Sequence, residues 1–154
     1  LIGAFLCWVA YKQHFDEEPD QAAKLAVFCT APAIRNPLFN LLTEIIGTFV
    51  LVFVVIASGL YTTSTKGDAV NLGWLGAFGV ALLIVVIGTG LGGPTGYAIN
   101  PTRDLCPRIM HAILPIKGKG DSDWSYSWVP VVGPMIGGLL GGLLAAPLLV
   151  FPLQ

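Results

Sequence analysis

Apolar residues gather in three long runs along the chain, at residues 39–60, 72–91 and 128–151. Each run reaches the ~20 residues that an α-helix needs to cross the hydrocarbon core of a bilayer. A fourth apolar run, at residues 1–11, is too short to span and looks like the end of another helix. Because the chain also does not begin with Met, we expect it to be a fragment that lacks its N-terminal part.

A shorter segment at residues 101–114 lies between the second and third long runs and carries Arg103, Asp104 and Arg108. Its length and charge suit a half-helix that enters the membrane without crossing it. Gly and Pro residues at positions 92–96 predict irregular backbone just before this segment. Membrane proteins tolerate such backbone only where it is buried in protein or borders a watery cavity. The pattern therefore predicts a cavity beside the start of the half-helix.

The first residues of the half-helix carry candidate binding chemistry. Asn100 is a natural N-cap and Pro101 a natural first helical residue. The side-chain oxygen of Asn100 can accept from the N–H of Thr102 or Arg103, which leaves its NH₂ donors turned toward a passing solute. The exposed positive end of the helix dipole favours polar or electron-rich solutes at the same place.

Arg103 and Glu44 are charged residues whose positions need a special reason. The helix dipole disfavours a cation in the first turn, so Arg103 is interpreted as lining a pore, with a buried ion pair to Asp104 as the alternative. Glu44 lies within the first long run, where a carboxylate is costly without a polar partner. Hydrogen bonds from the irregular backbone at residues 94–99 are favoured over a proton relay, because the sequence supplies no chain of further acids.

Composition agrees with a membrane protein. Hydrophobic residues make up 55% of the chain and charged residues 11%, with a mean hydropathy of +0.76, whereas a soluble domain carries about 25% charged residues. A net charge of −1 and the lack of a basic run argue against nucleic acid as a partner. The sequence shows no nucleophile, metal-ligand or cofactor pattern, so it predicts neither an enzyme nor a cofactor or metal site.

Cysteine and histidine are interpreted as structural residues. Cys7, Cys29 and Cys106 have no CxxC spacing and are assigned to packing. His14 and His111 lie near the expected membrane boundaries and are interpreted as ordinary interface residues. The acidic run at residues 16–20 is interpreted as a solvated loop face.

Glycine spacing predicts how the helix of the last apolar run packs. Gly133, Gly137 and Gly141 recur every four residues, which favours close packing within one subunit over a dimer interface.

The connections are predicted at residues 12–38, 61–71 and 115–128. Basic residues are more numerous in the first than in the second, which weakly predicts a cytoplasmic first connection.

The sequence Gly-Tyr-Ala-Ile-Asn-Pro-Thr-Arg-Asp at residues 96–104 resembles the second Asn-Pro-Ala box of the aquaporin, or major intrinsic protein, family. The resemblance covers nearly the whole chain, with Glu44 at the position of the family's buried acid. Within the family the chain is similar to the glycerol-conducting branch, the aquaglyceroporins or glycerol facilitators, and Gly88 falls where water-specific channels place a filter histidine. The other residues typical of that branch are Asp104, Arg108, Pro130 and the non-aromatic Val131.

The resemblance implies an all-α membrane fold, an aquaporin-like right-handed helical bundle with a re-entrant half-helix. Residues 1–154 are then one channel domain that holds the end of the third helix, the fourth and fifth helices, the half-helix and the sixth helix, without the N-terminal half. Residues 12–38 and 115–128 are implied to lie outside the cell and residues 61–71 inside, contrary to the charge count, and we favour this topology. A homotetramer of multi-pass subunits in the cell membrane is also implied.

The resemblance also implies a pore. Asn100 becomes the central solute ligand, and Arg103 and Tyr97 become filter walls beside Gly88. The carbonyls implied to line the pore belong to Gly96, Tyr97 and Ala98, and the implied supporting residues are Glu44, Asp104, Pro101 and Thr102. The chain departs from the family in two places, because Thr102 replaces the usual Ala and Tyr97 stands where Phe is common.

The implied function is a passive channel in the lipid bilayer for glycerol and related small uncharged solutes, with some water, that excludes protons and ions. A water-selective aquaporin, a secondary transporter and a structural membrane-junction protein are the alternatives. A transporter needs a coupling site, for which the lone Glu44 offers little.

Overall fold

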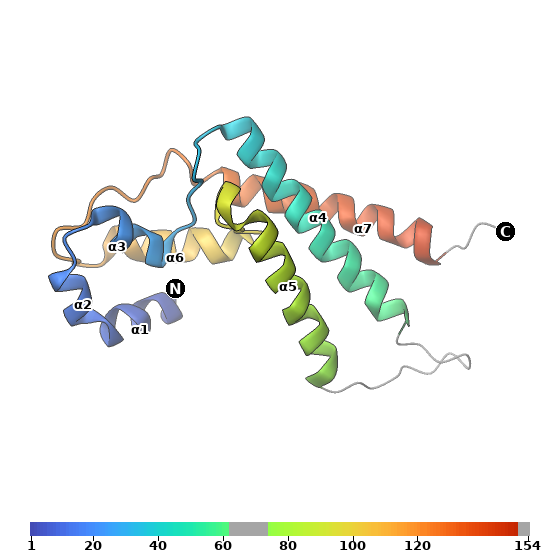
Figure 1. Ribbon diagram of the computed structural model, residues 1–154, viewed down its shortest axis with the longest axis horizontal. Coiled ribbons are helices and arrows are strands. Elements are labelled where there is room, and N and C mark those ends of the chain that lie inside the picture. Colours follow the sequence, from blue (N-terminus) through green and yellow to red (C-terminus); the bar gives the residue numbers. More distant parts are fainter. Residues whose placement is uncertain (62–73, 151–154) are drawn as a thin grey trace.

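The computed structural model describes residues 1–61 and 74–150, and all the regular structure within those ranges is helical. Figure 1 shows α4 and α7 packed along much of their length with α5 beside α4, while the short N-terminal helices gather around α6 at the other end of the molecule. The helices are α1 (Ile2–Ala10), α2 (Lys12–Glu17), α3 (Gln21–Phe28), α4 (Pro37–Tyr61), α5 (Trp74–Thr95), α6 (Pro101–Ile113) and α7 (Val129–Val150).

The long helices agree with the apolar runs of the sequence. Within the described residues, Pro37–Ser58 and Trp74–Thr95 are long and apolar enough to cross a membrane, with mean hydropathies of 2.4 and 2.2, and Val129–Ala145 of α7 is a shorter apolar stretch. Only 17% and 6% of the first two stretches are buried. Their apolar side chains therefore face outward, which suits lipid or further apolar helices and not the core of a soluble protein.

Close packing of α7 on α4 depends on one row of glycines. A Cβ atom on Gly137 would lie 2.3 Å from the carbonyl oxygen of Ile45, and one on Gly141 would lie 3.0 Å from the carbonyl oxygen of Phe49. The neighbouring Gly142 has no atom within 4 Å of such a position. The row predicted from Gly133, Gly137 and Gly141 is thus confirmed as a packing seam within this chain.

The prediction of irregular backbone from residue 92 is wrong, because α5 continues to Thr95 with Pro94 inside it. Its hydrogen bonding survives the proline, since the Gly96 N–H donates to the Gly92 carbonyl at 2.8 Å. The turn begins only at Gly96, whose φ is +74°. Tyr97 and Ile99 follow with φ values of 41° and 42°, a region that residues with a side chain rarely adopt.

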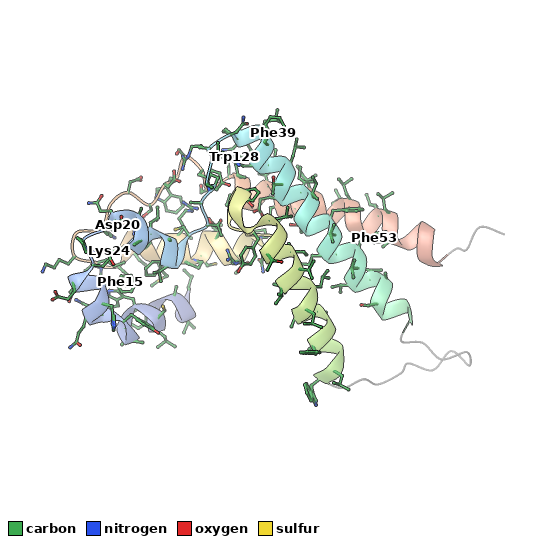
Figure 2. All side chains as sticks on the ribbon, viewed as in Figure 1. Phe15, Asp20, Lys24, Phe39, Phe53 and Trp128 are labelled. Atoms are coloured by element: carbon green, nitrogen blue, oxygen red, sulfur yellow. The ribbon has the colours of Figure 1, made fainter. Side chains whose placement is uncertain are left out.

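The first connection is more ordered than the sequence predicts. It contains α2 and α3, and the Asp20 side chain caps α3 by accepting from the Ala22 N–H at 2.8 Å. The acidic run is divided between elements, because Asp16 pairs with Lys12 on α2. Figure 2 shows Phe15, Asp20 and Lys24 gathered at the end of the molecule away from Phe53 of α4.

A small core joins this connection to the half-helix. Lys24 is buried and donates to the Lys117 carbonyl, so the first connection also contacts the last one. The buried apolar residues of this core are Phe15, Phe28, Cys29, Met110, Leu114 and Ile116. Most of the connection predicted at residues 61–71 and the C-terminal end of the last predicted run, at Phe151, lie outside the described residues.

Candidate functional site

The loop between α5 and α6 is held from behind by the carboxyl group of Glu44. The Ala98 N–H donates to Glu44 Oε1 at 3.0 Å, and the Ile99 N–H donates to Oε2 at 2.6 Å. Glu44 is only 1% exposed. This is the structural role that the sequence favours for the carboxylate, and it fixes Ile99, which has a positive φ, and Ala98, which lies between two residues with positive φ.

The same hydrogen bonds decide where the loop carbonyls point. In a trans peptide unit the C=O lies opposite the N–H of the next residue, and the described residues contain no cis peptide bond. The Tyr97 and Ala98 carbonyls therefore point away from Glu44. Ala98 is fully buried, so its carbonyl lies inside the described chain, whereas Tyr97 is half-buried.

Asn100 begins the half-helix α6. Its side-chain oxygen accepts from the Thr102 N–H at 2.9 Å, and its backbone carbonyl accepts from the Arg103 N–H at 3.1 Å. Pro101 is the first helical residue, and Thr102 follows on the exposed surface. Asn100 is exposed and its NH₂ group donates to no acceptor in the described part of the chain. The donors predicted for a solute are therefore open.

Tyr97, Arg103 and Gly88 form a cluster next to Asn100. The Arg103 guanidinium carbon lies 4.7 Å from the centre of the Tyr97 ring, within the range of a cation–π contact. A Cβ atom on Gly88 would approach Cε2 and Cζ of Tyr97 to 3.2 Å. The lack of a side chain at Gly88 thus leaves room for the Tyr97 ring, and the structure brings together the three residues that the resemblance groups as a filter.

An open cleft of about 510 Å³ lies against this cluster. It is lined by Gly96, Tyr97, Arg103 and Pro107 together with the chain at residues 26–31. The cleft is therefore lined by a cation, an aromatic ring and a segment of the first connection.

Asp104 pairs with Arg108 and not with Arg103. Arg108 Nε donates to Asp104 Oδ1 at 2.7 Å, and Nη2 donates to Oδ2 at 2.8 Å. Both side chains are fully buried. Arg108 also donates to the Ser122 carbonyl at 2.7 Å, so the pair connects the half-helix to the last connection. Arg103 thus remains exposed beside the cleft.

The interpretation of His111 as an ordinary interface residue is wrong, because its side chain is fully buried within the protein. Its Nδ1 lies 2.8 Å from Ser122 Oγ, and its ring centre lies 5.5 Å from that of Phe28. The signal that could have found it is spacing. Residues 104, 108 and 111 are four and three apart, which places them on one face of α6.

Cys29 and Asp123 lie outside the spanning helices and have shifted pKa values. Burial raises the pKa of the Cys29 thiol to about 12, which agrees with a packing role for this cysteine. Burial acts to raise the pKa of Asp123, but the hydrogen bonds from Arg35 and Ser125 and the positive charges of Arg35 and Arg108 together lower this pKa below its usual value. Asp123 therefore stays ionised and joins the first connection to the last one through Arg35.

Residues 1–145 match the family described as Major intrinsic protein. The chain belongs to the major intrinsic protein family. Its all-helical structure with long apolar helices agrees with the helical-bundle membrane fold of that family.

Curated relatives narrow the comparison. The chain is 51% identical to a glycerol uptake facilitator protein of Streptococcus pneumoniae, over 86% of this chain and 53% of the relative. It is 54% identical to a probable glycerol uptake facilitator protein of Thermotoga maritima, again over 86% of this chain and 53% of the relative. A D/L-lactic acid transporter of Lactiplantibacillus plantarum is 41% identical over 82% of this chain and 50% of that protein. The chain spans about half the length of the curated relatives it matches.

Proposed function

We propose that this chain supplies one half of a passive channel for glycerol and related small uncharged solutes, with some water, across the cell membrane. The observation that carries the proposal is the Glu44-held loop, which leads into the Asn100 cap of α6 and whose Tyr97 ring lies 4.7 Å from the Arg103 guanidinium carbon. The glycerol facilitators that the chain resembles at 51% and 54% identity support the choice of solute.

The arrangement matches the two-sided chemistry of a polyol. A polyol carries hydroxyl groups along one side of its carbon chain and C–H groups along the other. Its hydroxyls can accept from Arg103 and Asn100 and donate to the loop carbonyls, while its C–H groups lie against the Tyr97 ring. These contacts replace hydration step by step, which is the general basis of passage through a selective pore.

The same site opposes ions. Arg103 adds a positive charge at the cleft, and the N-terminus of α6 adds the positive end of a helix dipole beside Asn100. A cation or proton at this point meets both fields without a compensating carboxylate, because Asp104 is bound to Arg108 and Glu44 to the loop backbone. The proposed role is therefore passive transport of neutral solutes and not catalysis.

The assembly is part of the proposal. We take residues 1–154 as one channel domain whose open face, with Asn100 and Arg103 on it, is completed by a second half related by an inverted repeat. We further propose a homotetramer of multi-pass subunits with one pore each. The exposed apolar surfaces of α4, α5 and α7 are available for lipid, for the second half and for neighbouring subunits.

Solute flux in proteoliposomes tests the proposal. The full-length protein is reconstituted, and shrinking and reswelling after an osmotic step are followed by light scattering for glycerol, urea and lactic acid. Glycerol permeability should exceed that of empty liposomes, without saturation at low concentration and without dependence on a proton or sodium gradient. A flux that needs an ion gradient would favour a secondary transporter, and water flux without glycerol flux would favour a water-selective aquaporin.

A further inference from the structure

We propose that Thr30 is a positioning residue that sets the width of the solute mouth by clamping the first connection onto the half-helix. The inference rests on the proposed function, because it concerns the mouth of the same pathway. Thr30 lies outside the loop and the half-helix that carry Asn100, Tyr97 and Arg103. Thr30 affects the solute only by holding in place the segment at residues 26–31, which lines the cleft.

Three hydrogen bonds fix Thr30 to α6. Its N–H donates to Asp104 Oδ2 at 2.8 Å, and its Oγ1 donates to the same oxygen at 2.7 Å. Its carbonyl accepts from Arg108 Nη2 at 3.1 Å. Every polar group of Thr30 is thus bound to the buried Asp104–Arg108 pair, although 74 residues separate Thr30 from Asp104.

The clamp holds the chain against the loop that carries the candidate filter. A Cβ atom on Gly96 would lie 3.2 Å from Thr30 Cβ and 3.5 Å from the backbone N and O atoms of Ala31. Gly96 directly precedes Tyr97. The segment at residues 26–31 therefore packs onto the turn at Gly96 and lines the same cleft as Tyr97 and Arg103.

Two neighbouring residues of α6 connect the Thr30 clamp to Arg103 in the cleft. Asp104 follows Arg103 in the chain, so the residue that receives Thr30 and the residue that faces the solute belong to the same helical turn. The charges of Asp104 and Arg108 are buried and mutually satisfied, and such a network resists partial opening because any lost partner leaves a buried polar group unpaired. The distance across the mouth is therefore set by a rigid unit and not by a free loop.

Solute size is the property that this clamp controls. In the Thr30→Val variant the shape is kept and the hydroxyl donor is lost, so the wall loosens and longer polyols pass more easily. We expect the ratio of erythritol to glycerol permeability in the full-length protein to rise about threefold, the scale of one hydrogen bond. Thr30→Ser retains the hydroxyl and should restore the original ratio. Thr43→Val is the matched control, because Thr43 donates only to the Phe39 carbonyl of its own helix.

A second variant keeps the test decisive if Thr30→Val does not fold. Ala31→Leu adds bulk to the held wall without touching the clamp, and it should lower erythritol flux more than glycerol flux and glycerol flux more than water flux. An unchanged erythritol-to-glycerol ratio in a folded Thr30→Val protein, or in Ala31→Leu where Thr30→Val does not fold, overturns the inference but not the proposed function. Lack of glycerol flux in the unsubstituted protein overturns the proposed function and the inference with it.

Discussion

Glu44 and Ile99 are joined by a 2.6 Å hydrogen bond from the Ile99 N–H to Glu44 Oε2, across 55 residues of sequence. The bond connects the middle of the bundle to a residue with a φ of 42°. The other carboxyl oxygen holds Ala98 in the same way. One buried side chain therefore fixes the loop between α5 and α6, and this relationship leads to the first prediction.

Glu44→Gln should destabilise the loop. Glutamine offers one acceptor oxygen where glutamate offers two, so one of the Ala98 and Ile99 N–H groups faces an NH₂ group and stays unpaired. An unsatisfied buried N–H costs about 1–3 kcal/mol. Thermal unfolding of the purified protein in detergent measures the loss, with Thr43→Val as the half-buried control on the same helix. A transition temperature equal to that of the control would show that the loop does not depend on Glu44.

Gly88→His should narrow the pathway. A Cβ atom at residue 88 already approaches the Tyr97 ring to 3.2 Å, so an imidazole must occupy space beside Tyr97 and Arg103. Glycerol flux should fall much more than water flux, because the larger solute needs the full width. Permeability to both solutes is measured on the same proteoliposomes. Equal loss of both fluxes with normal expression would argue against this filter assignment.

Arg103→Ala should leave the pathway open and weaken its exclusion of ions. The guanidinium is exposed and is not paired with Asp104, so its removal takes away a charge from the cleft without breaking a buried ion pair. Proton or small-cation leak, followed with a pH-sensitive dye inside the liposomes, should rise. Unchanged ion exclusion together with unchanged solute preference would remove Arg103 from the filter.

Gly137→Ala and Gly142→Ala form a matched pair on α7. The new methyl group at residue 137 would lie 2.3 Å from the Ile45 carbonyl, which forces α4 and α7 apart, whereas residue 142 has open space. Overpacking of this kind costs about 1–3 kcal/mol. Gly137→Ala should therefore lower the unfolding temperature in detergent, and Gly142→Ala should leave it unchanged. Equal effects would contradict the packing seam.

Long-range packing marks the limit of what the sequence predicts here. The spans and the half-helix follow from residue type and length alone, because lipid imposes both. The sequence pattern does not predict the short helices α2 and α3. Helices of this length depend on tertiary contacts, here with the small core that contains Phe28 and Met110. The Gly and Pro residues at positions 92–96 also do not reveal that α5 continues through Pro94. The helix continues there because the Gly96 N–H still donates to the Gly92 carbonyl.

In the candidate site, too, some features follow from local sequence rules and others depend on contacts between distant residues. The Asn100 cap and the role of Glu44 follow from local rules about caps and buried carboxylates. The partners of Asp104 do not, because Thr30 reaches it from 74 residues away. The sequence left an Arg103–Asp104 pair open as an alternative, and only the fold shows that Arg108 takes that place.

The structure of the full-length protein with glycerol bound tests the central claim most directly. The account predicts glycerol density in the cleft beside Asn100, with hydroxyl groups within hydrogen-bond distance of the Arg103 guanidinium and the loop carbonyls, and with its C–H side on the Tyr97 ring. Glycerol bound elsewhere along the protein, with Arg103 turned into a buried contact away from any solute, would contradict the account.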